Sequence, residues 1–299
     1  MRLSEIRGIT GIAVQRDGDF QTLGFVSDSY QNLLVFLEDA RFLGSLRQNR
    51  SVSAVLTTGE LAGSVPPDLA VAVSSEPRAD FARLHNELAR RGFYWEDFPT
   101  VIDPTAKVHP SAWIAERNVR IGAATDIQPN ATLLERCVIG DGVVVGAGAV
   151  LGGVGFQTVR NTQPMIEMNH AGGLFVQDRV RVLPGAVVAT GMFRQGSSIS
   201  EDCRIGSNAF VSHAVQLGMR VFVGHGAVIN GNVTVGSDAW IGPGAIVSQN
   251  LQIGENACVS LGAVVIRNVI AGTRVSGNFA VPHRRLLRML ATLDPGSDG

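Results

Sequence analysis

The chain has 299 residues, of which 45% are hydrophobic, 17% charged and only 6% aromatic, and its formal net charge is −1. This composition excludes a disordered chain, a coiled coil and a disulfide-rich scaffold, and it gives no basic field for nucleic acid. The 35 glycines favour a regular interior with many tight turns. Three widely spaced cysteines predict reduced thiols, and the lack of a signal-peptide or membrane-spanning pattern predicts a cytoplasmic protein without a transmembrane segment.

Residues 1–100 alternate short apolar segments with polar stretches. The segment PRADFARLHNELARRG predicts an amphipathic helix, because Phe81, Leu84 and Leu88 share one face at helical spacing. Short apolar strands beside such a helix are typical of a small α/β domain.

From Ile102 onward, an aliphatic residue returns every six positions. The longest unbroken run consists of Ile199, Ile205, Val211, Leu217, Val223, Ile229, Val235, Ile241, Val247, Ile253, Val259 and Val265. The residue two places earlier is mostly small, and residues two apart in a strand face the same side. Six residues therefore make one flat side, and three sides close a coil of eighteen. The repeat predicts a β-solenoid over residues 101–277.

The repeat is interrupted at about 152–178 and again at 189–198. Loops ejected from a solenoid commonly carry binding function. Beyond the repeat, residues 278–299 contain HRRLLRMLATL, which predicts a final helix with a leucine stripe that covers the end of the solenoid.

The hexads together with GGVGFQ (152–157), NHAGG (169–173) and VSHAVQLG (211–218) resemble one family. It is the UDP-3-O-acyl-glucosamine N-acyltransferase family of lipid A biosynthesis, the LpxD-like hexapeptide acyltransferases. The resemblance covers essentially the whole chain. It implies a uridine-binding α/β domain at 1–100, a left-handed parallel β-helix at 101–277 with the looped-out segment 152–178, a C-terminal helix at 278–299, and a homotrimer.

Two motifs depart from the family pattern. The chain reads Val-Ser-His-Ala at 211–214 where the family usually has Ile-Ala-His-Asn, and Val-Ala-Thr-Gly at 188–191 where it usually has Ile-Asp-Arg-Gly. The tail is also short for a lipid A enzyme. The reaction class implied by the resemblance is unaffected by these differences. The amino sugar can be either a lipid A precursor or a sugar of surface-polysaccharide synthesis.

N-acyl transfer from a thioester to an amine needs a group that accepts the amine proton and a donor for the tetrahedral oxyanion. His213 lies two residues after an inward aliphatic residue, so its side chain is expected to point outward. It also falls at the family's catalytic histidine, which implies a general base. Gly231 lies one coil of eighteen residues further on, so its N–H is expected to stack on His213 and serve the oxyanion. A solvated histidine and an ordinary bend glycine are the alternatives.

Three further residues are expected near the sugar or the loop. His170 matches a histidine or glutamine of the family and is expected to hold the sugar or to pack the loop. Phe156 is expected to anchor the loop against the coil. Asn250 takes a place where the lipid A enzymes often carry a second histidine.

In the N-terminal domain, LVFLEDARFLGSL (34–46) resembles the segment that holds uridine in the family. Phe36 and Phe42 fall at its two aromatic positions, where rings stack on a pyrimidine, although a place in the hydrophobic core is the alternative. Asp39 replaces a typical Asn and is an acceptor only. Both UDP and dTDP therefore remain open.

Other reaction classes have weaker support. A zinc-bearing solenoid of the γ-class carbonic anhydrase type usually has two histidines five residues apart, and the sequence contains no such pair, so we expect no metal. Cys137 and Cys203 occupy inward positions and are expected in the core. A nucleotidyltransferase is disfavoured because the N-terminal domain lacks a glycine-rich phosphate loop.

We therefore predict an enzyme, an N-acyltransferase that moves an acyl group from a carrier thioester to the amine of a nucleotide-linked amino sugar, without a permanently bound cofactor. Its partners are a second and third copy of the chain and either acyl carrier protein or coenzyme A as acyl donor. Three arginines of the final helix suit an acidic carrier protein, and coenzyme A phosphates as well: Arg284, Arg285 and Arg288. The alternatives are a short-chain acyl-CoA-dependent amino-sugar N-acyltransferase of O-antigen synthesis and a non-catalytic β-helix scaffold.

Overall fold

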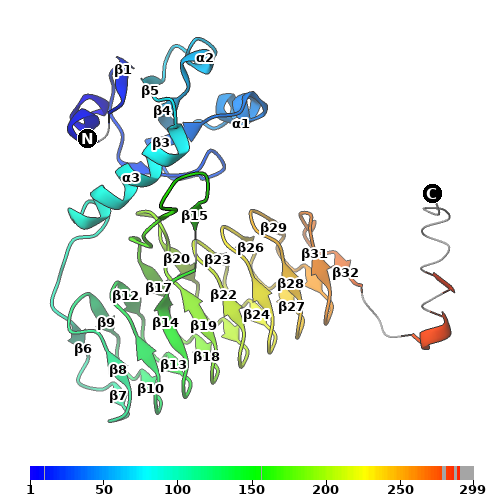
Figure 1. Cartoon of the computed structure of the whole chain (residues 1–299). Helices are drawn as coiled ribbons and strands as arrows, with labels where there is room; N and C mark the ends of the chain where they lie inside the picture. Colours follow the sequence, from blue (N-terminus) through cyan, green and yellow to red (C-terminus); the bar gives the residue numbers. More distant parts are fainter. Residues whose placement is uncertain (10, 156, 278–280, 286–287, 290–299) are drawn as a thin grey trace.

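A computed structural model describes the chain except for residues 10, 156, 278–280, 286–287 and 290–299. In the described part of the chain, no helix has the length and hydrophobicity needed to cross a bilayer. Figure 1 shows a small α/β unit above one end of a long coil of short strands.

The N-terminal unit is built on a five-stranded sheet with the order β1-β5-β4-β3-β2. Strands β2 to β5 run parallel, and β1 is antiparallel to β5. The strands are β1 (Ala13–Arg16), β2 (Thr22–Leu23), β3 (Leu33–Leu37), β4 (Val52–Thr57) and β5 (Ala70–Val73). Short helices connect them: η1 (Leu3–Gly8), η2 (Ala40–Phe42), α1 (Leu43–Gln48) and α2 (Gly59–Ala62).

Helix α3 (Pro77–Arg90) is the amphipathic helix that the sequence predicts. Its buried face contains Phe81, Leu84 and Leu88, which share a hydrophobic core with residues of the sheet. The same face also buries His85 completely. The helix therefore lies between the N-terminal sheet and the coil (Figure 1).

The coil consists of three parallel sheets, one on each side. The β7 sheet contains β7 (Lys107–Val108), β10 (Asp126–Ile127), β13 (Val144–Val145), β18 (Arg181–Val182), β21 (Arg204–Ile205), β24 (Phe222–Val223), β27 (Trp240–Ile241), β30 (Cys258–Val259) and β32 (Arg274–Val275). The β8 sheet contains β8 (Trp113–Ile114), β11 (Thr132–Leu133), β14 (Val150–Gly153), β19 (Val187–Ala189), β22 (Phe210–Val211), β25 (Val228–Ile229), β28 (Ile246–Val247) and β31 (Val264–Val265). The β6 sheet contains β6 (Val101–Ile102), β9 (Val119–Ile121), β12 (Cys137–Ile139), β17 (Leu174–Val176), β20 (Ser197–Ile199), β23 (Gln216–Leu217), β26 (Thr234–Val235) and β29 (Gln252–Ile253).

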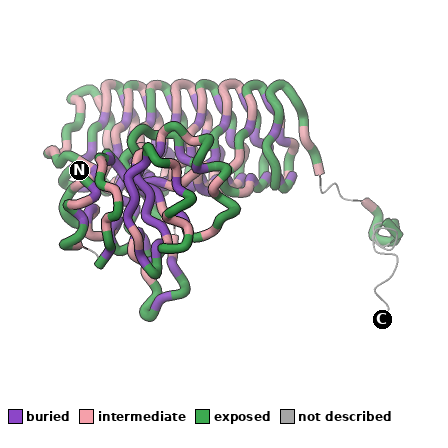
Figure 2. The backbone as a smooth tube through the Cα atoms, turned by 90° about the horizontal axis from the view of Figure 1, so that it is seen from above, coloured by how far each residue is buried: buried purple, intermediate pink, exposed green. Residues whose placement is uncertain are grey.

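The register of these sheets confirms the eighteen-residue coil. Val211 pairs with Ile229, and Ile229 pairs in turn with Val247. These inward residues are fully buried, and buried positions alternate with exposed ones along the coil (Figure 2). The predicted solenoid is therefore confirmed.

Tight corners join the sides of the coil. A Cβ atom added to Gly224 would lie 2.3 Å from Pro243 N, so the corner has room for glycine only. Other corner residues adopt a positive φ, which Gly, Asn and Asp tolerate best. Ala214 departs from this preference with a φ of 56°.

The looped-out segment is shorter than the predicted 152–178. Gly153 still pairs with Ala189 in the β8 sheet, and Leu174–Val176 already pairs with Cys137–Ile139 in the β6 sheet. The prediction was too long because a three-residue strand after a loop shows too little periodicity to be recognised. Between these points the chain forms a hairpin of β15 (Thr158–Val159) and β16 (Ile166–Glu167).

This hairpin packs against the N-terminal unit. Met168 and Val159 belong to the same hydrophobic core as Phe81 of α3. The side chain of Asn86 on α3 donates from Nδ2 to the Glu167 carbonyl at 2.7 Å. The excursion from the coil therefore connects the N-terminal unit to the coil.

The predicted final helix is described in part. Residues 283–285, 288 and 289 are helical, whereas Leu286, Leu290 and Leu293 of the predicted stripe lie outside the described residues. The described arginines Arg284, Arg285 and Arg288 are exposed.

Candidate active site

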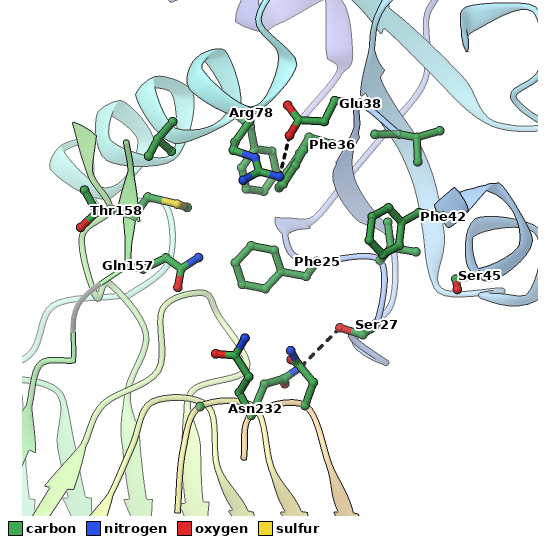
Figure 3. A pocket seen from close by; sticks show the side chains of 18 of the residues that line it. Phe25, Ser27, Phe36, Glu38, Phe42, Ser45, Arg78, Gln157, Thr158 and Asn232 are labelled. Atoms are coloured by element: carbon green, nitrogen blue, oxygen red, sulfur yellow. Dashed lines mark hydrogen bonds and ion pairs between the residues drawn. The ribbon is translucent and has the colours of Figure 1, made fainter. Parts of the chain in front are cut away.

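A cavity of about 480 Å³ lies where the N-terminal unit, the hairpin and the coil meet (Figure 3). Each of the three parts contributes side chains that face this cavity. Its lining includes Phe25, Ser27, Phe36, Glu38, Phe42, Arg78, Gln157, Met168, His213, Gly231, Asn232 and Asn250. The cavity thus brings together residues as far apart in sequence as Phe25 and Asn250.

His213 lies at the corner that follows β22, and its imidazole is half-buried. Its Nδ1 atom lies 3.3 Å from the Ser212 hydroxyl. Burial lowers the pKa of His213 below its ordinary value. The imidazole is therefore neutral near pH 7, which is the form that accepts a proton.

Gly231 stacks directly on His213, as the eighteen-residue coil predicts. The N–H of Asn232 donates to the His213 carbonyl at 2.9 Å, which fixes the two corners against each other. A Cβ atom added to Gly231 would lie 2.4 Å from His213 Nε2, so glycine leaves the space that the imidazole occupies. The Gly231 N–H has no hydrogen-bond partner among the described residues, whereas the Gly231 carbonyl accepts from the Asn250 N–H at 3.0 Å.

Amide side chains continue the wall of the cavity on the next coil. Asn232 donates from Nδ2 to Asn250 Oδ1 at 3.0 Å and lies 3.4 Å from the Ser27 hydroxyl. Asn250 therefore lines the cavity one coil beyond Asn232. The Ser27 contact links the coil directly to the N-terminal unit.

Aromatic rings form the opposite wall. The ring of Phe36 lies 5.1 Å from that of Phe81 and 6.5 Å from that of Phe25. The guanidinium of Arg78 lies over Phe36, 5.4 Å from the ring centre, and pairs with Glu38 Oε1 at 2.5 Å. Of the described lining residues, Arg78 carries the positive charge and Glu38 the negative one.

The predicted uridine segment is only partly in the cavity. Phe36 lines its inner wall, and Phe42, whose exposed fraction is 52%, lines its outer part. Asp39 does not line the cavity, because its carboxylate caps the short helix η2 and binds the Arg41 guanidinium. The hydrogen bond from Arg41 lowers the pKa of Asp39.

His170 lies behind His213 and does not line the cavity. Their ring centres are 5.2 Å apart, with the rings edge to face. Burial lowers the pKa of His170 to about 4, and the nearby His213 and His85 add to the effect. Phe156 lies outside the described residues, so its predicted anchoring stays a prediction.

Several cavity residues were not recognised from the sequence. Phe25 and Ser27 lie in one segment of the N-terminal unit and Arg78 in another, and no shared pattern connects the two segments. Ser212 was visible in the motif Val-Ser-His-Ala, but only as a departure from the family pattern. Because Ser212 directly precedes His213, its proximity to the expected general base could have been inferred from the sequence.

Other reactive groups lie apart from the cavity. Cys137 and Cys203 are buried in the core of the coil, as their inward positions predict. Burial raises the pKa of these thiols to about 12 and about 11, which keeps them protonated. Within the described residues, no three His, Cys, Asp or Glu side chains are grouped as metal ligands.

The chain is similar to several known transferases. A family model described as "Bacterial transferase hexapeptide (six repeats)" matches residues 118–153. A UDP-3-O-acylglucosamine N-acyltransferase of Herminiimonas arsenicoxydans is 25% identical over 256 residues, which cover 73% of this chain and 72% of the relative. An enzyme of the same name from Azorhizobium caulinodans is 26% identical over 259 residues, or 75% and 72% of the two chains. A solved Arabidopsis UDP-N-acetylglucosamine acyltransferase has a TM-score of 0.45 and 20% identity over 64% of this chain and 77% of that one.

The six-residue repeat and the three-sided parallel coil form a left-handed β-helix, and residues 118–153 match the hexapeptide transferase model. Over about three quarters of its length, the chain is similar to curated enzymes of the LpxD-like acyltransferase type. The resemblance, the fold class and the prediction of an enzyme are thereby confirmed.

Proposed function

We propose that this acyltransferase moves an acyl group from a carrier thioester to the amine of a nucleotide-linked amino sugar. The observation that carries the proposal is the convergence of His213, the Gly231 N–H and an aromatic wall with Arg78 in one cavity. In this proposal, these groups supply a base, an oxyanion donor and a nucleotide site within one cavity.

The reaction follows from the geometry around His213. The sugar amine attacks the thioester carbonyl carbon while the imidazole takes the amine proton. The tetrahedral oxyanion accepts a hydrogen bond from the Gly231 N–H, which lies beside the same imidazole. The carbon–sulfur bond then breaks, and the leaving thiolate takes the proton from the imidazolium.

The N-terminal wall supports a nucleotide diphosphate. Phe36 and Phe42 line the cavity, and aromatic rings are surfaces on which a pyrimidine can stack. The Arg78 guanidinium is held over Phe36 and offers a charge to a phosphate group when it leaves Glu38. We propose UDP as the nucleotide, since the relatives are named for a UDP-linked sugar. The position of Asp39 outside the cavity removes it from base recognition.

The sugar is bound between the two walls in this proposal. Asn250 and Asn232 offer amide groups to sugar hydroxyls on the side of the coil. The relatives are named for acylation of a glucosamine that already carries a 3-O-acyl group. An acylated glucosamine nucleotide is therefore the first substrate to test, followed by other amino sugars.

The enzyme is further proposed to act as a homotrimer with a carrier-protein thioester as donor. The outward positions of the β8 sheet form an apolar row on one side of the coil, which suits contact with a second copy. The row consists of Trp113, Thr132, Val150, Val187, Phe210, Val228, Ile246 and Val264. The exposed residues Arg284, Arg285 and Arg288 support docking of an acidic carrier protein, and coenzyme A is the alternative donor.

The proposal is tested by mass spectrometry of the purified full chain mixed with UDP- and dTDP-linked amino sugars and acyl donors. Each sugar is offered with both an acyl-carrier-protein and a coenzyme A thioester. We expect an N-acylated product with at least one UDP-amino sugar. His213→Ala is expected to lower the rate by about 10²–10⁴-fold, because a positioned base is lost. His109→Ala, which changes an exposed histidine of the coil, is the matched control and should keep full activity.

The panel also separates the alternatives. Product from coenzyme A alone would favour a short-chain amino-sugar acyltransferase over a carrier-protein enzyme. An absence of product with every pair, in protein that is folded and assembled, would refute the proposed reaction.

A further inference from the structure

We propose that Ser212 and His170 are positioning residues that hold the proton of His213 on Nδ1 and so leave Nε2 free as the base. This inference rests on the proposed role of His213 as the general base. It concerns the side of the imidazole that faces away from the cavity. Neither residue touches the reacting atoms in this arrangement.

The two ring nitrogens of His213 face different surroundings. An added Cβ on Gly231 would lie 2.4 Å from Nε2, and Gly231 lines the cavity, so Nε2 is on the side of the proposed oxyanion donor. An added Cβ on Gly155 would lie 2.9 Å from Nδ1. Nδ1 therefore faces the base of the looped-out segment.

Two hydrogen-bonding groups meet on this Nδ1 side. Ser212 Oγ lies 3.3 Å from His213 Nδ1, and the Ser212 side chain is buried. The same point above Gly155 lies 3.5 Å from His170 Nε2 and 3.6 Å from Ser212 Oγ. His170 Nε2 is buried and has no hydrogen-bond partner among the described residues. In the tautomer that carries its proton on Nδ1, His170 has an unused lone pair on this Nε2 beside His213.

The residue after the base offers no such group. Ala214 ends in a methyl group, so the residue directly after His213 supplies no polar side chain. A neutral histidine has one N–H and one lone pair, and the partner of one nitrogen decides which form is present. Ser212 and His170 are the neighbouring groups that can determine which nitrogen of His213 carries the proton.

His170 is held in place from both sides. The Arg136 guanidinium donates to the His170 carbonyl at 3.0 Å and to the Gly172 carbonyl. One residue earlier, the Asn169 carbonyl lies 2.6 Å from His85 Nε2. The exposed fraction of His170 is 7%, so the imidazole has little freedom to turn away.

The protonation state of His170 agrees with an acceptor role. Burial lowers the pKa of His170 to about 4, and burial likewise lowers the pKa of His85 to about 4. His170 is therefore neutral near pH 7 and can present a lone pair rather than a positive charge. Its neutrality also avoids repulsion when His213 becomes an imidazolium.

The proton transfers at His213 balance over one turnover. Before reaction, Nδ1–H of His213 donates to the Ser212 oxygen or to His170 Nε2, and Nε2 carries a lone pair. The amine proton moves to Nε2 as the carbon–nitrogen bond forms, while the Nδ1 proton stays in place. The Nε2 proton then passes to the sulfur of the leaving thiolate, which restores the starting tautomer.

The test measures the tautomer of His213 directly and does not require turnover. Full-length protein with ¹⁵N-labelled histidine is studied by long-range ¹H–¹⁵N NMR, and His213→Gln identifies the signal. We expect the wild type to carry the proton on Nδ1. The double variant Ser212→Ala/His170→Leu should shift toward the Nε2–H form. The variant Ser212→Ala/His170→Gln, whose amide oxygen still accepts, should keep the wild-type form.

Kinetics give the second measurement. Ser212→Ala/His170→Leu is expected to lower kcat by about 10- to 100-fold with little change in KM, because the substrate contacts are intact while the base is misdirected. Ser111→Ala is the matched control, since His109 Nδ1 and Ser111 Oγ make a similar contact at 2.8 Å on an outer coil. This control should leave turnover unchanged.

The outcomes separate this inference from the proposed function. It is wrong if wild-type His213 carries its proton on Nε2, or if the tautomer is the same in the double variant. If this double variant fails to fold, as judged by circular dichroism, Ser212→Ala/His170→Ala replaces it, and an unchanged tautomer in that variant contradicts the inference. A tautomer that responds as expected in a protein without any acyl transfer supports the inference and contradicts the proposed reaction.

Discussion

Gly231 and His213 contact each other so closely that one methyl group is enough to disturb them. In Gly231→Ala the new Cβ would lie 2.4 Å from His213 Nε2, so the imidazole must move. A misplacement of this size is expected to lower turnover by about 10²-fold and to cost about 1–3 kcal/mol of stability. Initial rates and chemical denaturation of the same protein sample measure the two effects.

A second glycine gives the control for this change. Gly63 follows helix α2 with a negative φ, and an added Cβ there meets no atom within 4 Å. Gly63→Ala should therefore keep both turnover and stability. Unchanged turnover in Gly231→Ala would show that the imidazole does not work in the position seen here.

At the scale of secondary structure, Arg78 of helix α3 forms an ion pair with Glu38, the residue that follows strand β3. If Arg78 binds a phosphate of the nucleotide, Arg78→Ala should raise KM about 10- to 100-fold, because a charge-assisted hydrogen bond is lost from substrate binding. The turnover number should change little. Steady-state kinetics with the nucleotide sugar as the varied substrate measure both constants.

Arg83 on the same helix is the matched control. It pairs with Asp80 at 2.7 Å and does not line the cavity, so Arg83→Ala should leave KM unchanged. Glu38→Gln frees Arg78 from its partner and is expected to lower KM or leave it unchanged. An equal rise in KM for Arg78→Ala and Arg83→Ala would point to a general effect of helix charge.

Helix α3 also makes stability depend on pH through His85. Burial lowers the pKa of His85 to about 4 in the folded chain, against 6.5 for the ordinary group. The unfolded chain therefore binds the proton first, so stability is full above about pH 6.5 and falls as the pH drops toward 4. The difference between the two pKa values corresponds to about 3 kcal/mol, and His170 acts in the same direction.

Chemical denaturation between pH 8 and pH 4 measures this loss. In His85→Gln the free energy of unfolding should fall less steeply as the pH drops. The variant also loses the contacts of His85 to Tyr94 and Asn169, which lowers its stability at every pH. His109→Gln, which changes an exposed histidine, should follow the wild-type curve. The assignment to His85 is wrong if the free energy of unfolding of His85→Gln falls with pH as steeply as that of the wild type.

At the scale of the whole molecule, the apolar row on the β8 sheet predicts how copies assemble. Ile246 lies in this row with an exposed fraction of 42%, so Ile246→Glu should not disturb the fold of one chain. It places a charge in the proposed contact, so the trimer that we propose for the wild type should dissociate to monomers in this variant. Light scattering coupled to size-exclusion chromatography measures the mass of the assembly.

Phe222 offers a matched control on another side of the coil. Its exposed fraction is 44%, and it lies on β24 of the β7 sheet. Phe222→Glu should remain trimeric. A wild-type monomer at working concentration, or a trimer that survives Ile246→Glu while Phe222→Glu dissociates, would contradict the proposed contact side.

The sequence by itself determined the coil and its register, because these depend on a pattern that repeats locally along the chain. The six-residue period follows from the geometry of a strand and recurs along the chain, so the period by itself stacks Val211, Ile229 and Val247 on one another. The same arithmetic places Gly231 on His213. The amphipathic face of α3 is readable for a similar reason, since its spacing is fixed by the helix itself.

Only the tertiary structure decided how the N-terminal unit meets the coil. It brought Phe25 and Arg78 to the cavity, turned Asp39 away toward Arg41 and placed His170 behind His213. Each of these contacts joins segments that pack once and do not repeat. A period in the sequence reports contacts that recur at a fixed distance along the chain, whereas a single long-range contact depends on how two surfaces fit.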